Sequence, residues 1–191
     1  MEGKEQILET IAKLFFRYGV KSLSMDDIAW KSGLTKRKLY DYFKNKEEIV
    51  TEVVLASYNQ WRMLVDEKMQ AEGNPIEILL DIYYSRFQLF TDFNPLFFTE
   101  TEKTYREIAD LYKRFGEEFN GQVIVPLLQN AEQEGHLKKG VDIGIVCDLH
   151  NVLFDSLLHT DRPFLLQGKK RQTWFKHWIE YPVRGILNED I

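Results

Sequence analysis

The stretch from Ser24 to Lys46 limits the possible folds of this chain most strongly, because it describes two short helices joined by a tight turn. Ser24 and Asp27 have the spacing of a capping box, in which each side chain satisfies a backbone N–H at the start of a helix. Gly33 stands where a left-handed backbone can end that helix, and Thr35 can cap the next one. The stretch therefore predicts a helix-turn-helix, whose first helix braces the second.

The second helix of this pair is strongly basic. From residue 31 to residue 46 the chain has six Lys or Arg and one acid, Asp41. A basic cluster alone is more often a solvated helix face, but here it coincides with the caps, the glycine and inward-facing apolar residues such as Leu39 and Phe43. The second helix of a helix-turn-helix presents its N-terminal residues to the DNA major groove. We therefore expect this helix to bind double-stranded DNA.

Charge is distributed unevenly along the chain. The formal net charge is −5, yet residues 1–50 hold ten Lys or Arg against eight Asp or Glu, and the acidic excess lies in the remainder. An acidic body behind a basic tip favours one orientation on DNA.

The single cysteine excludes an intrachain disulfide. The sequence shows no signal-peptide core and no apolar run of about 18 residues. We expect a cytoplasmic protein without a membrane segment.

Three stretches carry a family resemblance: FRYGVKSLSMDDIA (16–29), SGLTKRKLY (32–40) and YFKNKEEIV (42–50). They resemble the DNA-binding domain of the tetracycline-repressor (TetR) family. The resemblance implies an all-α homodimeric transcription regulator, usually a repressor that a small molecule releases from its operator. It places a three-helix helix-turn-helix domain in residues 1–47 and a helical ligand-binding and dimerisation domain in residues 48–191.

The same resemblance assigns DNA-contacting roles. It places Arg37 at the base-facing start of the second helix, where relatives often have a small residue. The operator sequences of relatives therefore do not predict the operator sequence of this protein. Arginine pairs well with guanine O6 and N7, and we expect at least one G·C pair beneath Arg37. The full set comprises base-facing Thr35, Lys36, Arg37 and Lys38, backbone-contacting Tyr40, Tyr42 and Lys46, and the phosphate candidates Ser24 and Met25.

Helical periodicity predicts the other elements. A helix over 4–18 supports the helix-turn-helix. A helix from Asn45 to about Met69 would be about 36 Å long and forms the only continuous link to the rest of the chain. The remaining helices are predicted at 75–92, at 101–134 with a kink near 121–126, at 141–159, and at 171–188 with a bend at Pro182.

Residues 76–120 are unusually rich in aromatic side chains. Core packing explains any one of them, but the set exceeds what a two-layer helical body needs, and tyrosine hydroxyls and Arg86 add polar groups. We expect a pocket for a hydrophobic or aromatic effector, or for an anion if Arg86 or Arg106 faces inward. The candidate ligand-binding residues are Tyr83, Arg86, Phe87, Phe90, Tyr105, Tyr112 and Phe115.

Two apolar stripes near the C-terminus predict a dimer interface, which the family resemblance implies is a four-helix bundle. Large aromatic side chains are common interface anchors. The alternative is that both stripes close the core of one chain. The candidate interface residues are Cys147, His150, Phe154, Trp174, Trp178 and Tyr181.

Catalysis has weak support. Cys147 and His150 lie three residues apart on one predicted helix, which is too few ligands for a zinc site, and the sequence has no phosphate-binding glycine loop. We expect no catalytic residue, no metal and no cofactor. The alternatives are a helical small-molecule-binding protein or an enzyme that uses the Cys147/His150 region. A helical adaptor for protein partners is a third, but it would need no basic helix.

Overall fold

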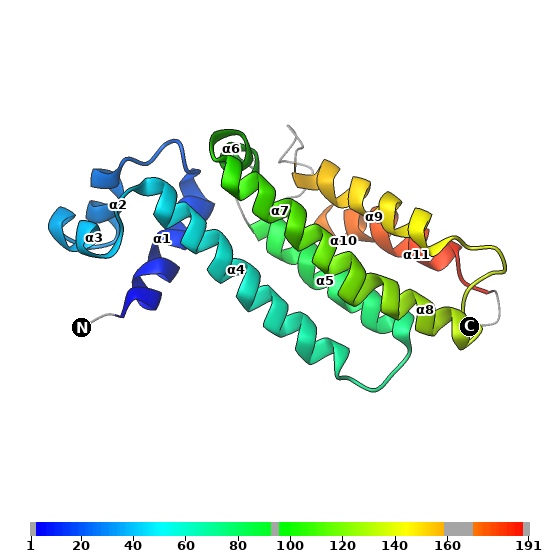
Figure 1. The fold of residues 1–191 in the computed structure, drawn as a ribbon. Helices are drawn as coiled ribbons and strands as arrows, with labels where there is room; N and C mark the ends of the chain where they lie inside the picture. The colour runs from blue at the N-terminus through cyan, green and yellow to red at the C-terminus, as the bar shows by residue number, and fades with distance from the viewer. Residues whose placement is uncertain (1–2, 93–95, 159–169, 189–191) are drawn as a thin grey trace.

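The computed structural model describes residues 3–92, 96–158 and 170–188 (Figure 1). Regular secondary structure in these ranges is helical, apart from one isolated bridge between Leu137 and Leu187. This confirms the prediction of an all-α fold. The helices are α1 (Lys4–Tyr18), α2 (Met25–Lys31), α3 (Lys36–Tyr42), α4 (Lys46–Met69), α5 (Pro75–Asp92), α6 (Leu96–Thr104), α7 (Arg106–Phe119), α8 (Val125–Gln133), α9 (Ile143–Leu158), α10 (Lys170–Phe175) and α11 (Tyr181–Gly185).

Caps define the starts of α2, α3 and α4. The Ser24 backbone N–H donates to the Asp27 carboxylate at 2.8 Å, and the Asp27 N–H donates to the Ser24 hydroxyl at 3.2 Å, which completes the capping box. Thr35 and Asn45 accept the corresponding bonds at α3 and α4. Gly33 has φ +73°, a left-handed conformation that glycine adopts without strain. These local signals confirm the predicted helix-turn-helix.

The three N-terminal helices share a core with the first half of α4. This cluster includes Phe15, Ile28, Leu39 and Val53, all of which are buried. It also contains Phe97 of α6 and Ile108 of α7. The core of the N-terminal unit therefore extends into helices that lie far along the sequence.

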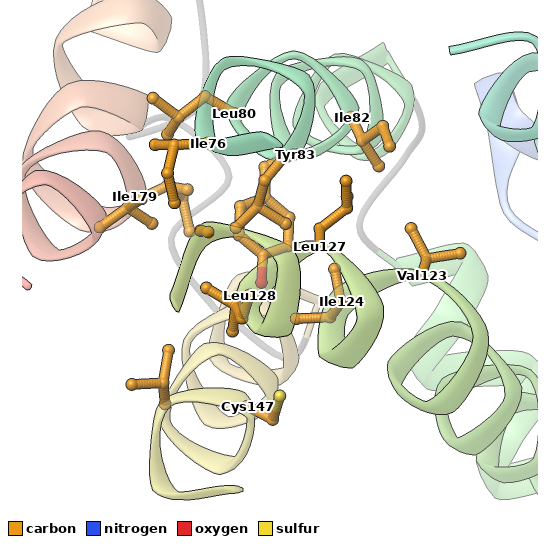
Figure 2. Packing of buried hydrophobic residues seen from close by; sticks show 14 of the residues in the cluster. Ile76, Leu80, Ile82, Tyr83, Val123, Ile124, Leu127, Leu128, Cys147 and Ile179 are labelled. Carbon is orange, nitrogen blue, oxygen red and sulfur yellow. The ribbon is translucent and has the colours of Figure 1, made fainter. Parts of the chain in front are cut away.

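A second core holds the body together. α4 runs along one side, α5, α7 and α8 occupy the middle, and α9 to α11 cover the other side (Figure 1). Figure 2 shows Tyr83 of α5 among Ile124, Leu127 and Leu128, with Cys147 of α9 pointing toward the same core. Within the described ranges no helix combines the length and apolarity that a membrane span needs.

The predicted helix over 101–134 differs from the structure in one respect. α6 begins at Leu96 and ends at Thr104, and Tyr105 is extended (φ −126°, ψ 105°) before α7 begins. The threonines of α6 are weak helix formers, whereas Phe97 and Ile108 are fully buried in the N-terminal core. The break lets both side chains reach that core from helices with different axes.

In the described part of the chain, two helical segments contain a π-helical turn shortly before a proline. The turns span Asn120–Ile124 and Lys176–Glu180, and they precede Pro126 and Pro182. Proline has no backbone N–H, and its ring crowds the preceding turn of an α-helix. The wider π turn accommodates this, so each proline changes the helix geometry without ending the helix.

Candidate DNA-binding surface and ligand pocket

α3 lies at the end of the molecule farthest from α8 and α11 (Figure 1). Leu39 is fully buried and fixes the rotation of the helix, while Thr35, Lys36, Arg37 and Tyr40 are exposed. Lys38 is half-buried. The start of α3 therefore presents its basic side chains to the solvent, as a helix that enters a DNA groove requires.

One of these cations is engaged within the motif. Lys36 Nζ lies 2.7 Å from the Asp26 carboxylate of α2. The hydrogen bond and the charge of Asp26 raise the pKa of Lys36. The ion pair ties the start of α3 to the start of α2, a contact that the sequence analysis did not predict. Arg37 is exposed beside it and is the better placed of the two for a base contact.

The remaining predicted DNA residues border this surface. Ser24 is exposed and already caps α2, whereas Met25 and Tyr42 are half-buried against the N-terminal core. Lys46 is half-buried at the start of α4. Burial lowers the pKa of Lys46, and the carboxylates of Glu100 and Asp27 act in the opposite direction.

A cavity of about 700 Å³ lies in the body, with walls from α1, α4, α5, α6, α7 and α9. Eight of its eighteen lining residues are aromatic. The phenol of Tyr58 stacks on Phe115 with ring centroids 3.6 Å apart and planes 5° apart. The lining residues are Phe16, Val54, Ser57, Tyr58, Trp61, Arg86, Phe97, Phe98, Glu102, Ala109, Asp110, Tyr112, Lys113, Phe115, Phe119, Asn151, Val152 and Asp155.

Three of the seven predicted ligand residues line this cavity: Arg86, Tyr112 and Phe115. Tyr83 and Phe87 instead lie in the second core, where Phe87 packs against Phe175 with centroids 5.6 Å apart. The cavity lining does not include Tyr105, which packs against the N-terminal core. The side chain of Phe90 lies outside the described residues. Burial raises the pKa of Tyr112, whose hydroxyl pairs with Thr101 at 3.1 Å.

Sequence reasoning missed the contributions of α1 and α4 to the cavity. Phe16 comes from α1, and Tyr58 and Trp61 come from α4. The spacing of Tyr58 and Trp61 placed them on one face of a helix, but no local signal showed that this face meets α7.

The wall of the cavity is directly connected to the DNA-binding unit through α6. Phe97 packs edge-on against Phe16, with centroids 4.9 Å apart. One turn later the Glu100 carboxylate accepts a hydrogen bond from the Lys21 backbone N–H at 2.9 Å, in the loop that leads to α2. Gly19 has φ +79°, and a Cβ there would lie 3.1 Å from a Glu100 oxygen. The backbone conformation therefore favours glycine at this position, and a larger side chain would also have to displace the end of the Glu100 side chain slightly.

α9 presents two apolar faces, and its predicted interface residues lie on the inner one. Cys147, His150 and Phe154 are at most 5% exposed, so they have almost no surface left to bury against a partner. Their burial favours the alternative that this stripe closes the core of one chain, and their place in the dimer interface stays a prediction. The exposed face carries Ile145, Leu149 and Val152 (58%, 58% and 65% exposed).

The other predicted interface residues keep accessible surface. Tyr181 is 53% exposed, and Trp174 and Trp178 are partly buried and pack edge-on with centroids 4.9 Å apart. α10 and α11, which contain Trp174 and Tyr181, lie on the same side of the body as α9 (Figure 1).

The Cys147/His150 region has the character of a packed core. The Tyr83 hydroxyl pairs with His150 Nδ1 at 2.7 Å. Burial lowers the pKa of His150 to about 4 and raises the pKa of Cys147, so the thiol is less reactive than an exposed one. Among the described residues no group of three His, Cys, Asp or Glu side chains could hold a metal ion.

Comparison with known proteins agrees with this geometry. Residues 7–53 match the family described as bacterial regulatory proteins, tetR family. YhgD of Bacillus subtilis, an uncharacterised HTH-type transcriptional regulator, is 33% identical over 70 residues, which make up 37% of each chain. The chain therefore spans little more than a third of the length of that relative.

Other similarities extend over most of the chain. The HTH-type transcriptional repressor KstR2 of Mycobacterium tuberculosis is 25% identical over 149 residues, which are 74% of this chain and 72% of KstR2. The solved structure of KstR2, a ketosteroid transcriptional regulator, has a TM-score of 0.71 at 19% identity and covers 97% of this chain and 95% of its own. The fatty acid metabolism regulator protein of Bacillus subtilis is 22% identical over 189 residues, 96% of this chain and 95% of that protein. The capped helix-turn-helix, the helical body behind it and these similarities agree, and residues 7–53 form a DNA-binding domain of the tetR family of bacterial regulatory proteins.

Proposed function

We propose that this protein is a homodimeric transcription regulator, most simply a repressor, that binds a palindromic DNA operator and is released from it by an apolar effector. The observation that carries the proposal is the basic start of α3, which is exposed at the tip of the molecule on a helix fixed by the buried Leu39. A bacterial regulator of this kind acts in the cytoplasm, where the DNA is.

The aromatic cavity supports an apolar effector. Pockets of this size with a few polar groups are typical of small-molecule sites. The names of two relatives refer to regulation of fatty acid metabolism and to a ketosteroid regulator, and both are consistent with an apolar ligand. An enzyme based on Cys147 and His150 is not favoured, because both side chains are packed in the core.

α6 supports a route from the effector to the DNA-binding unit. It contributes Phe97 and Phe98 to the cavity wall, and its Glu100 holds the loop after α1 through the Lys21 N–H. A ligand that displaces these rings also displaces Glu100 relative to the loop. In the dimer this movement, together with a tilt of α4, changes the separation of the two α3 helices, which must match half-sites about 34–36 Å apart or a multiple of this distance.

The exposed apolar stripe of α9 supports the dimer. Ile145, Leu149 and Val152 recur at helical spacing on one exposed side of α9, and apolar side chains are typical of the centre of interfaces. Two DNA-binding units are needed to contact a palindromic operator.

Selection of bound DNA from a random pool tests this function. We expect a palindromic sequence with at least one G·C pair in each half-site. Arg37→Ala should then reduce discrimination at that pair by about 1–3 kcal/mol. Lys139→Ala, at an exposed lysine outside the helix-turn-helix, is the matched control and should leave discrimination unchanged. Recovery of no preferred sequence by the wild-type protein would contradict the proposal.

A further inference from the structure

Two aspartates are adjacent at the start of α2, and the fold uses them differently. Asp27 completes the capping box with Ser24, and the hydrogen bonds of that box lower the pKa of its carboxyl group. Asp26 instead reaches across to α3, where its carboxylate lies 2.7 Å from Lys36 Nζ. The Asp26 and Lys36 side chains are still 66% and 61% exposed. Because water and salt screen an exposed ion pair, this one contributes little to stability.

The ion pair lies at the part of the helix-turn-helix that the proposed function directs toward DNA. Lys36 is the first residue of α3, directly after the capping residue Thr35, and Asp26 lies in the first turn of α2. In this motif the N-terminal residues of the second helix are the ones that contact base edges. A base pair that Lys36 contacts is therefore also within reach of the carboxylate beside it.

The two charged atoms match the spacing of one base pair. In the major groove, guanine presents the acceptor O6 and cytosine presents the donor N4–H, and these two atoms lie about 2.9 Å apart because they are hydrogen-bonded to each other. The ion pair presents a donor and an acceptor 2.7 Å apart. Lys36 can therefore donate to O6 or N7 of guanine while Asp26 accepts from N4 of cytosine.

Inverting the base pair removes this match. Lys36 would then face the amino group of cytosine, which is a donor, and Asp26 would face O6 of guanine, which is an acceptor. Charged groups that lose water without gaining a partner carry a large penalty, and such a mismatch rejects the wrong sequence. The pair T·A keeps the order of acceptor and donor, but thymine has no N7, so it ranks below G·C.

We propose that Asp26 is a specificity-determining residue, which acts with Lys36 as one unit to read the orientation of a G·C pair in each half-site. This inference rests on the proposed DNA-binding function and specifies how one position of the operator is read. The positive charge of Lys36 balances that of Asp26, so the pair can approach the phosphates that line the groove without net repulsion.

Binding measurements on the selected operator test the orientation. Each G·C pair is inverted in turn, in both half-sites, and the affinity of the full-length protein is measured by fluorescence anisotropy. We expect one inversion at which the wild type loses at least about fivefold in affinity and Asp26→Ala loses about threefold less than the wild type. Glu9→Ala removes the same charge from an exposed position of α1 and is the control, which should behave like the wild type.

Two further variants show whether the ion pair acts as a unit. Lys36→Ala should reduce discrimination at the same base pair as Asp26→Ala, and the double variant should lose no more there than the single variants do, because coupled residues are not additive. Asp26→Asn keeps the shape of the side chain but adds a donor, so it should also tolerate the inverted pair. If Asp26→Ala does not fold, Asp26→Asn decides by the same criterion.

Three results would overturn the proposal. The penalty for every inversion may be the same in Asp26→Ala as in the wild type. Asp26→Ala may instead bind all sequences more tightly by one factor, which would mean that Asp26 only repels phosphates. Lys36→Ala and Asp26→Ala may also act at different base pairs. In each case DNA is still selected, so the regulator proposal survives, whereas recovery of no preferred DNA by the wild type contradicts both proposals.

Discussion

The buried pair of Tyr83 and His150 predicts a strong pH dependence of stability. Burial lowers the pKa of His150 to about 4 in the folded protein, whereas an unfolded chain has a histidine pKa of about 6.5. Between these values the unfolded state binds a proton that the folded state excludes. The contribution of His150 is therefore fully present above pH 6.5 and is lost as the pH falls toward 4.

The linkage relation gives the size of this effect. With these two pKa values, His150 alone lowers the free energy of unfolding by about 2 kcal/mol between pH 7 and pH 5, and by about 3 kcal/mol well below pH 4. For a chain of this length, 2 kcal/mol corresponds to a decrease of about 4–8 °C in the melting temperature.

Urea denaturation at pH 7 and pH 5 measures the difference. His150→Gln keeps an acceptor for the Tyr83 hydroxyl and removes the titrating group, so the variant should lose about 2 kcal/mol less than the wild type over this interval. His177→Gln, at an exposed histidine, is the control and should behave like the wild type. If His150→Gln and the wild type lose the same amount, His150 is not held neutral by burial and the reasoning fails.

Three further predictions concern the proposed function. Glu100→Ala should lower the free energy of unfolding by about 1 kcal/mol through loss of the hydrogen bond from Lys21. It should also reduce the factor by which an effector weakens operator binding, and Glu100→Gln should have an intermediate effect. If binding assays show an unchanged factor, α6 does not connect the cavity to the DNA-binding unit. Lys46→Ala should weaken binding to all DNA sequences alike and reduce the slope of log affinity against log salt by about 0.9 per lost phosphate contact. An unchanged slope would show that Lys46 makes no phosphate contact. Leu149→Lys should produce monomers in sedimentation, while Gln60→Lys on exposed α4 surface should not; a dimeric Leu149→Lys variant would place the interface elsewhere.

The helix-turn-helix was predictable from sequence because its signals are local. Ser24, Asp27 and Asn45 act within one turn of their own position, and Gly33 needs only its own backbone conformation. A buried Leu39 then determines which side of α3 is exposed.

The cavity could not be predicted in the same way, because it depends on which helices meet. Phe16, Trp61 and Asn151 are separated by long stretches of sequence and meet only through tertiary packing. The periodicity of one helix does not show whether its neighbour fills the space or leaves a cavity.

The exposed side of α9 shows a different difficulty. One face holds Cys147 and Phe154 and the other holds Leu149 and Val152, and both are apolar. When both faces of a helix are apolar, periodicity indicates burial on each but does not tell which one faces the core of its own chain. The structure resolves this by placing Phe154 against Tyr83, with centroids 5.4 Å apart.

The π-helical turn over Asn120–Ile124 has a consequence for chain length. Such a turn contains one residue more than a turn of α-helix, and each residue of an α-helix rotates the chain by about 100°. Straightening the segment at constant length would swing Leu127 and Leu128 out of the core by that angle. Deleting exposed Gly121, together with a Pro126→Ala change, would instead yield a regular helix with both leucines still inward. We therefore expect that the protein can lose one residue at this position inside a helix and keep its packing.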